Sequence, residues 1–191
     1  MKKSVLVLIT GVLVLTSCTI GNGDVIREER RISGFNSISV VGVANVNIRP
    51  GADYRVVVIT DENVQSRVVT ETRNNVLYIN IKSKKGIKSN QLTVDVQLPE
   101  LQSLNLIGVG DVSITNGSAT DLAISLAGVG SINAQNYRVE NVNIRHAGVG
   151  DVRIWATHSL DGALSGVGNI RYKGNPTVSV RVSGVGKVSA L

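Results

Sequence analysis

"HAGVGDVRI", residues 146–154, places two glycines around one valine and follows them with alternating apolar residues. The chain contains five versions of this stretch: "LIGVGDVSI", "LAGVGSINA", "HAGVGDVRI", "LSGVGNIRY" and "VSGVGKVSA". The first glycine falls at positions 108, 128, 148, 166 and 184, so the period is 20, 20, 18 and 18 residues. A period of this size indicates stacked structural repeats. The glycines predicted to shape the corners are Gly108, Gly110, Gly128, Gly130, Gly148, Gly150, Gly166, Gly168, Gly184 and Gly186.

Apolar residues alternate with polar residues on both sides of each glycine pair. Two positions before the first glycine stand Leu106, Leu126, His146, Leu164 and Val182. Four positions after it stand Val112, Ile132, Val152, Ile170 and Val188. Strict alternation predicts short strands with one buried face, and no helical period competes with it.

Two architectures could use such units: a parallel β-helix with one repeat per coil, or an antiparallel meander with a hairpin at each glycine pair. We favour the coil, because a two-residue hairpin turn prefers Asn, Asp or Gly where this motif has valine. The predicted fold is all-β: a parallel β-helix-like solenoid with coils of 18–20 residues. We further expect the five central valines to be buried inside the corner: Val109, Val129, Val149, Val167 and Val185.

The first half of the chain is less regular. A sixth, degenerate copy surrounds Gly42, with Ala44 in place of the second glycine. Further strands are expected at 54–60, 76–82 and 92–98, with one helical turn, a hairpin across "RNN" and a basic loop "KSKKGIK" between them. The expected division is a β-rich part over 34–99 and the repeat array over 100–191.

The N-terminus predicts export and lipidation. Residues 1–17 have the basic start, apolar run and small-residue exit of a signal peptide. The exit resembles a bacterial lipobox that ends at Cys18, the single cysteine of the chain, so we expect lipidation of Cys18 and a tether over 18–33. Thr19, in place of an aspartate, favours the outer membrane, and the choice between its periplasmic and surface faces stays open.

Composition argues against a nucleic-acid partner. The formal net charge of +6 falls to +4 once the leader with Lys2 and Lys3 is removed, and aromatic residues make up 3% of the chain. Nucleic-acid binding usually requires basic runs with stacking aromatics.

Several segments together resemble the head GIN domain family of auto-transporter adhesins. They are the lipobox, "REERRISGFNSISVVGVANVNIRPG", "VLYINIK" and the ladder of "GVGD", "GVGS" and "GVGN" corners. The resemblance covers residues 36–191 and implies a right-handed β-helix-like fold in an exported Bacteroidetes protein. It also implies a surface or periplasmic role and supplies no catalytic residues.

The position after the second glycine carries a polar row: Asp111, Ser131, Asp151, Asn169 and Lys187. A calcium ladder would use such oxygens, but Ser and Lys interrupt the row and the period is too long, so we favour solvated turns. His146 is expected to be a hydrogen-bonded core residue, since a zinc site would need more partners than His158. We therefore expect no metal, no cofactor and no catalytic residues.

The candidate surface for binding comprises Trp155, Arg153, Arg171 and Lys187, of which the three basic residues should lie on one side of the coil. The leading hypothesis is a non-enzymatic, lipid-anchored protein that binds a protein or a glycan at the cell envelope. A polysaccharide-active enzyme that uses the basic residues is one alternative. A structural protein that forms homo-oligomers through its open coil end is another.

Overall fold

The structure is a computed structural model that describes residues 19–82, 87–89 and 91–191. The predicted leader, Cys18 and most of the basic loop lie outside these residues. The described strands are β1 (Thr19–Ile20), β2 (Val25–Arg30), β3 (Ser37–Val41), β4 (Asn45–Pro50), β5 (Arg55–Asp61), β6 (Val68–Arg73), β7 (Val76–Ile81), β8 (Ile87–Lys88), β9 (Leu92–Leu98), β10 (Ser103–Leu106), β11 (Val112–Ile114), β12 (Ser118–Leu126), β13 (Ile132–His146), β14 (Val152–Leu164), β15 (Ile170–Lys173), β16 (Thr177–Val182) and β17 (Val188–Ala190). One short helix, α1 (Glu62–Gln65), follows β5.

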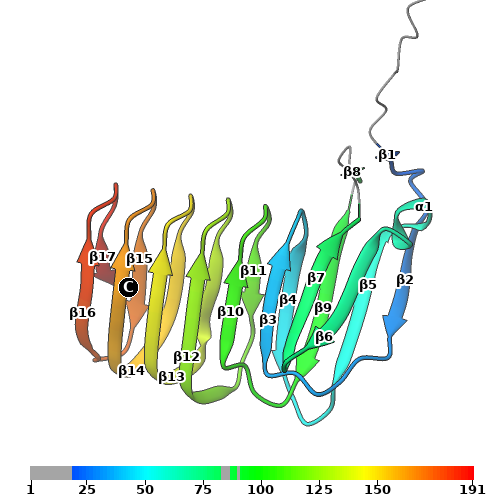
Figure 1. Cartoon of the computed structure of the whole chain (residues 1–191). Helices are drawn as coiled ribbons and strands as arrows, with labels where there is room; N and C mark the ends of the chain where they lie inside the picture. Colours follow the sequence, from blue (N-terminus) through cyan, green and yellow to red (C-terminus); the bar gives the residue numbers. More distant parts are fainter. Residues whose placement is uncertain (1–18, 83–86, 90) are drawn as a thin grey trace, which may run out of the picture.

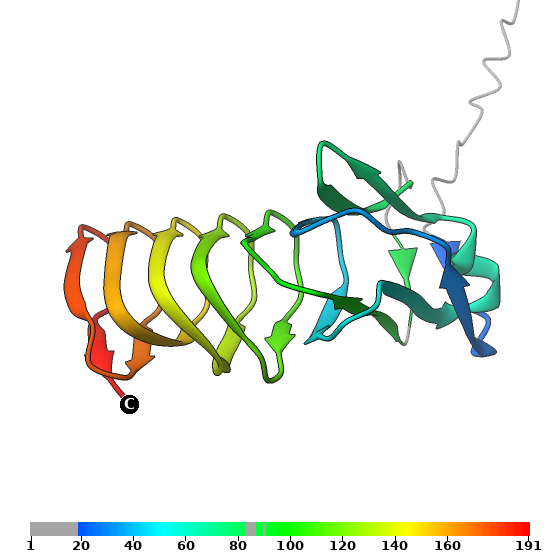
Figure 2. The ribbon, with the colours of Figure 1, turned by 90° about the horizontal axis from the view of Figure 1, so that it is seen from below.

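The fold is all-β, as predicted. Fifteen strands belong to one mixed sheet that bends back on itself, so that two walls face each other across the core (Figures 1 and 2). Successive repeats pair in parallel, with equivalent residues opposite one another except around Arg138 and Val139. One wall is formed by β10, β12, β16 and the second halves of β13 and β14. The other is formed by β11, β15, β17 and the first halves of β13 and β14.

The N-terminal half extends both walls. On one wall β3 pairs in parallel with β10, followed by β7 and the antiparallel β6. On the other, β4 pairs in parallel with β11, followed by β9 and the antiparallel strands β5 and β2. These pairings confirm the degenerate copy around Gly42 and the hairpin at Asn74–Asn75. The predicted helical turn is confirmed as α1. The predicted tether over 18–33 is partly wrong, because β2 lies within it.

The glycine pairs sit at turns that stack directly on one another. A Cβ on Gly128 would lie 1.9 Å from the carbonyl oxygen of Gly108, which no real side chain could do. Gly130 has φ of +144°, a conformation that L side chains rarely adopt, and its Cβ would lie 2.0 Å from the carbonyl oxygen of Gly110. Backbone contact between neighbouring turns thus requires glycine at both positions.

The predicted burial of the central valines is wrong. Val149 is 48% exposed and Val185 is 70% exposed. Both flanking glycines lie against the neighbouring turns, so alternation along the extended chain directs the valine between them to the outside. Isolated parallel bridges join these residues in a single line: Val43, Val109, Val129, Val149, Val167 and Val185. We call this line the valine ridge.

The core is formed by the alternating apolar residues that the sequence predicted. Leu106, Leu126, His146 and Leu164 are consecutive partners in the parallel register and are all buried. At the edge opposite the valine ridge, the buried Tyr137 hydroxyl accepts a hydrogen bond from the Leu101 N–H at 3.1 Å and donates to the Leu101 carbonyl at 3.2 Å. These two hydrogen bonds tie β13 to the segment that precedes β10.

Candidate binding face

One wall of the sheet presents a continuous polar surface, which we call the polar face. It is the outer side of β5, β9, β4, β11, β15, β17 and the first halves of β13 and β14. Alternation creates it: along β4, Val46 and Ile48 are fully buried while Asn45, Asn47 and Arg49 point outward. The parallel register then aligns outward residues from strand to strand, from β9 to β17. The central row is Asp95, Asn47, Ser113, Asn133, Arg153, Arg171 and Ser189.

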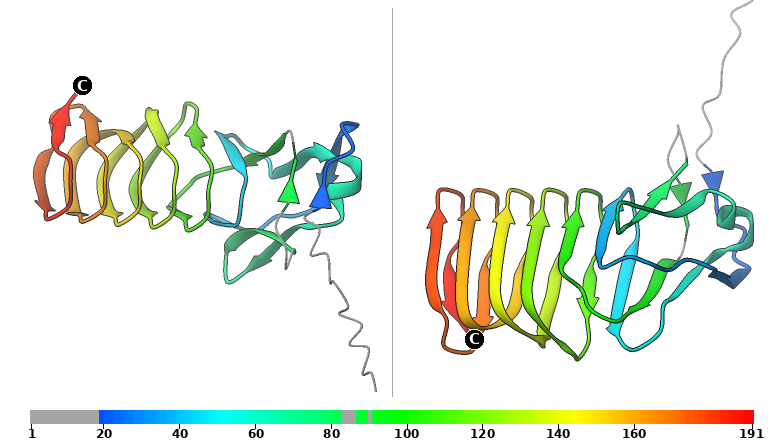
Figure 3. Two further views of the ribbon diagram at one scale, coloured as in Figure 1. Left: turned by 90° about the horizontal axis from the view of Figure 1, so that it is seen from above. Right: turned by 60° about the horizontal axis from the view of Figure 1, so that its bottom comes forward.

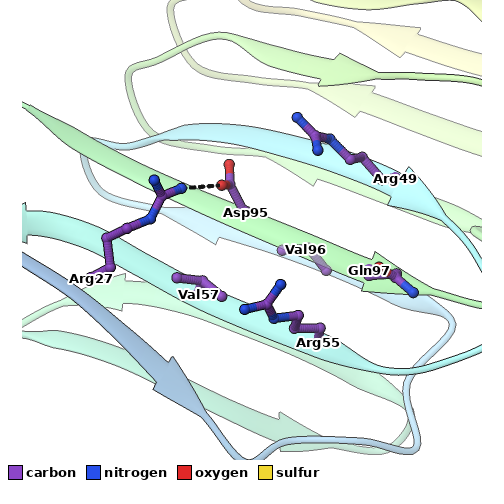
Figure 4. A pocket seen from close by; sticks show the side chains of 7 residues that line it. All are labelled: Arg27, Arg49, Arg55, Val57, Asp95, Val96 and Gln97. Carbon is purple, nitrogen blue, oxygen red and sulfur yellow. Dashed lines mark hydrogen bonds and ion pairs between the residues drawn. The ribbon is translucent and has the colours of Figure 1, made fainter.

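The N-terminal end of the polar face holds a shallow basic pocket with a volume of about 200 Å³. Figure 4 shows the side chains of Arg27, Arg49 and Arg55 around Asp95. Arg27 pairs with Asp95 at 3.3 Å, and Asn47 Nδ2 donates to the other Asp95 oxygen at 2.9 Å. The Asp95 carboxylate is thus occupied.

The remaining arginines of the pocket differ in their partners. Arg55 pairs with Glu29 at 3.3 Å, and both side chains are more than half exposed. Arg49 makes no ion pair among the described residues. Its guanidinium group keeps five N–H donors for a ligand. Sequence reasoning missed this pocket, because its residues come from the irregular half of the chain.

The C-terminal end of the polar face carries the residues that the sequence singled out. Arg153 on β14 and Arg171 on β15 are direct partners in the register. Trp155 is next to Arg153 on the wall, and Lys173 places its ammonium group 3.8 Å from the centre of the indole ring. Lys173 was missed, although the 18-residue period would have placed it opposite Trp155.

Trp155 therefore points outward, between the buried Ile154 and Ala156, with the Lys173 ammonium group over its ring. Lys187 lies one turn beyond Asn169, in the row that follows the glycine pairs. The four predicted residues are on the same wall, with Lys187 at its border.

That bordering row forms a ladder of side-chain acceptors. The Oδ1 atom of each Asx residue accepts the backbone N–H of the equivalent residue in the next turn. The pairs are Asn45 to Asp111, Asp111 to Ser131, Asp151 to Asn169, and Asn169 to Lys187. The hydrogen bond from the Asn169 backbone, with help from the Asn169 side chain, Arg171 and Arg153, lowers the pKa of Asp151 despite its partial burial. These oxygens serve the turns, as the turn interpretation expected, but across units.

His146 is buried, and its Nε2 lies 2.6 Å from the carbonyl oxygen of Gly150, so the predicted hydrogen-bonded core histidine is confirmed. Its Nδ1 has no hydrogen-bond partner among the described residues. Those residues also contain no group of three or more His, Cys, Asp or Glu arranged to hold a metal ion. No described helix has the length and apolarity needed to cross a membrane.

The structure thus defines an all-β protein with stacked turns and an extended polar wall. The chain belongs to the family described as "Putative auto-transporter adhesin, head GIN domain", whose sequence profile matches residues 34–116 and 105–176. This confirms the resemblance seen in the sequence.

Two solved structures are similar to this one. A "putative adhesin" from Bacteroides fragilis is 24% identical with a TM-score of 0.62, over 90% of this chain and 99% of the other. A "putative lipid binding protein" from Parabacteroides distasonis is 23% identical with a TM-score of 0.50, over 92% of this chain and 100% of the other. At these identities the likeness concerns the fold. Comparison with curated proteins gave no match.

Proposed function

We propose that this protein is a non-enzymatic, adhesin-like protein of the cell envelope that binds an acidic glycan through the polar face. The observation that carries the proposal is the wall itself, where Arg49 offers free donors at one end and Arg153 and Arg171 stand side by side at the other. Arginine binds carboxylates in a bidentate manner, and Asn and Ser pair with hydroxyls. An extended chain of acidic sugars presents both groups.

The shape of the array supports an extended ligand. We propose that the repeats form a right-handed β-helix-like solenoid with coils of 18–20 residues, in line with the parallel register of equivalent residues. Neighbouring coils are about 4.8 Å apart. Outward residues therefore repeat along a straight line, which suits a polymer better than a small molecule.

Membrane attachment completes the proposal. Cys18 would carry the lipid and would hold the protein at a membrane, most simply the outer membrane, with residues 1–17 removed during export. The adhesin family supports an exported or cell-surface protein. Labelling with palmitate tests the anchor, since a Cys18→Ser chain should take up none. Protease shaving of intact cells decides between the surface and the periplasmic face.

A binding role also fits the carboxylates of the polar face. Asp95 is held by Arg27 and Asn47, and the oxygens of Asp111 and Asp151 accept backbone N–H groups. General acid and base catalysis needs carboxylates that are free to exchange protons with a substrate. We therefore place binding ahead of a polysaccharide-active enzyme.

The test is binding of the full chain to immobilised polygalacturonate, with neutral dextran as the control polymer. Arg49→Ala, or Arg153→Ala together with Arg171→Ala, should weaken binding by about tenfold or more, because each removes charge-assisted hydrogen bonds. Arg145→Ala with Arg181→Ala is the matched control, since both arginines are exposed on the opposite wall. Equal loss in both pairs would contradict the assignment of the face, and release of reducing sugar would contradict a non-enzymatic role.

A further inference from the structure

The valine ridge is the most regular apolar feature on the surface. Its valines occupy the tips of consecutive turns at the same edge, and all but Val185 are 48–53% exposed. With a spacing of about 4.8 Å, six such tips extend for roughly 24 Å. Water-exposed apolar side chains are ordinarily scattered, and a contiguous line indicates an interaction site.

The flanks of the ridge are small or uncharged on one side and polar on the other. The residues before each first glycine are exposed, and they are Ile107, Ala127, Ala147, Ser165 and Ser183. The acceptor ladder runs along the other flank, with its oxygens directed to backbone N–H groups. The ridge is therefore a convex line of methyl groups and lacks the concave shape that a peptide or small ligand needs.

The chain enters the fold at this same edge. β1 begins with Thr19, the residue next to Cys18, and pairs in parallel with β8. Figures 1 and 3 show β1 and β8 at the edge formed by the glycine turns, away from the opposite edge that contains the connection from β15 to β16. Ile20, also in β1, is 67% exposed.

We infer that the valine ridge is a membrane-docking edge that lies on the lipid bilayer to which Cys18 is attached. This inference rests on the lipidation in the proposed function. A lipid on residue 18 would hold the edge of β1 at the membrane, and the ridge continues that edge along the whole array. One row of half-exposed valines enters only the interfacial region, so it orients the protein while the lipid anchors it.

The consequence is a fixed orientation. The strands stand upright on the membrane, the array runs parallel to it, and both walls remain accessible. The polar face would then be held at right angles to the bilayer, with the edge that contains Tyr137 farthest from it.

Tryptophan scanning tests the orientation with the full chain purified from membranes and reconstituted into phosphatidylethanolamine and phosphatidylglycerol vesicles with brominated acyl chains. In a Trp155→Phe background, Val149→Trp and Val129→Trp should shift their emission to shorter wavelength and be quenched by the bromine. Asn175→Trp, exposed at the opposite edge, should show neither change. Circular dichroism checks the fold, and the second ridge position is used if the first variant does not fold.

Attachment is measured separately by co-sedimentation with the vesicles. If the protein sediments and the ridge tryptophans are not quenched, or Asn175→Trp is quenched equally, the docking edge is wrong and the anchor stands. If the protein carries no lipid, the anchor is wrong, and the docking edge, which depends on the anchor, is overturned with it.

Discussion

Asp151 and Asn169 are joined across two neighbouring turns, because Asp151 Oδ1 accepts the Asn169 backbone N–H at 2.8 Å and the Asn169 side-chain amide at 3.2 Å. The backbone hydrogen bond to an Asx side-chain oxygen recurs along the border of the polar face, at Asp111 and at Asn169. Each of these side chains supplies the acceptor that the next turn needs. The turns are therefore linked by side chains as well as by backbone pairing.

Acid should weaken the array through Asp151. Its pKa is lowered in the folded state, so its contribution to stability is present above the unfolded pKa and is lost as pH falls through the folded value. Asp151→Asn keeps an acceptor oxygen and cannot titrate. Between about pH 6 and about pH 3, the urea midpoint of the wild type should fall by more than that of the variant. Parallel curves for the two proteins would contradict the prediction.

Ser131 interrupts the acceptor ladder, because serine has neither an amide nor a carboxylate oxygen to accept the Asp151 backbone N–H. Ser131→Asn should complete the ladder and raise the free energy of unfolding by about 0.5–1 kcal/mol. Ser113→Asn is the matched control, since Ser113 lies in the central row of the wall. Urea denaturation of both variants measures the difference, and an equal effect at both positions would argue against a specific ladder.

Any side chain at Gly148 should destabilise the fold. A Cβ at this position would lie 2.1 Å from the carbonyl oxygen of Gly128, so Gly148→Ala must separate two stacked turns. We expect a loss of about 3 kcal/mol, against about 1–2 kcal/mol for Asp151→Ala. Ala147→Ser, at an exposed neighbour, should be neutral. Thermal melts that place Asp151→Ala below Gly148→Ala would overturn this order.

Tyr137 should contribute through its hydroxyl group. Tyr137→Phe leaves the buried N–H and carbonyl of Leu101 without this partner, which should cost about 1–3 kcal/mol. Tyr78→Phe, at a half-buried position on β7, should cost less. Burial raises the pKa of Tyr137, so its contribution persists below the unfolded pKa and is lost as pH rises toward the folded value. Chemical denaturation at neutral pH provides the comparison.

The repeat array was predictable because its evidence is redundant. Equivalent residues such as Leu106 and Leu126 recur at a fixed distance from the glycines, and the structure pairs them directly. The orientation of the central valine was not predictable from alternation alone. It depends on how closely neighbouring turns approach, and that distance is set by backbone contacts such as Gly128 with Gly108.

The sequence patterns outside the array predict the strands less clearly. The charged "REER" of β2 lacks apolar alternation, yet it forms an edge strand beside β5, where charged side chains face water. Arg49 and Arg55 become neighbours only because β9 pairs with both β4 and β5, a non-local arrangement that no local pattern encodes. The basic residues around Trp155 were found because they share the repeat register.

The change of period from 20 to 18 residues is absorbed in one place. The register between β13 and β14 is continuous up to Ala134, shifts around Arg138 and Val139, and is regular again from Asn141 onward. The two turn edges of the molecule therefore differ. The glycine edge fixes the register, and the opposite edge tolerates changes in the length of the repeat. A family built in this way can acquire new loops at one edge, or whole additional units, while the spacing of the glycine turns stays constant.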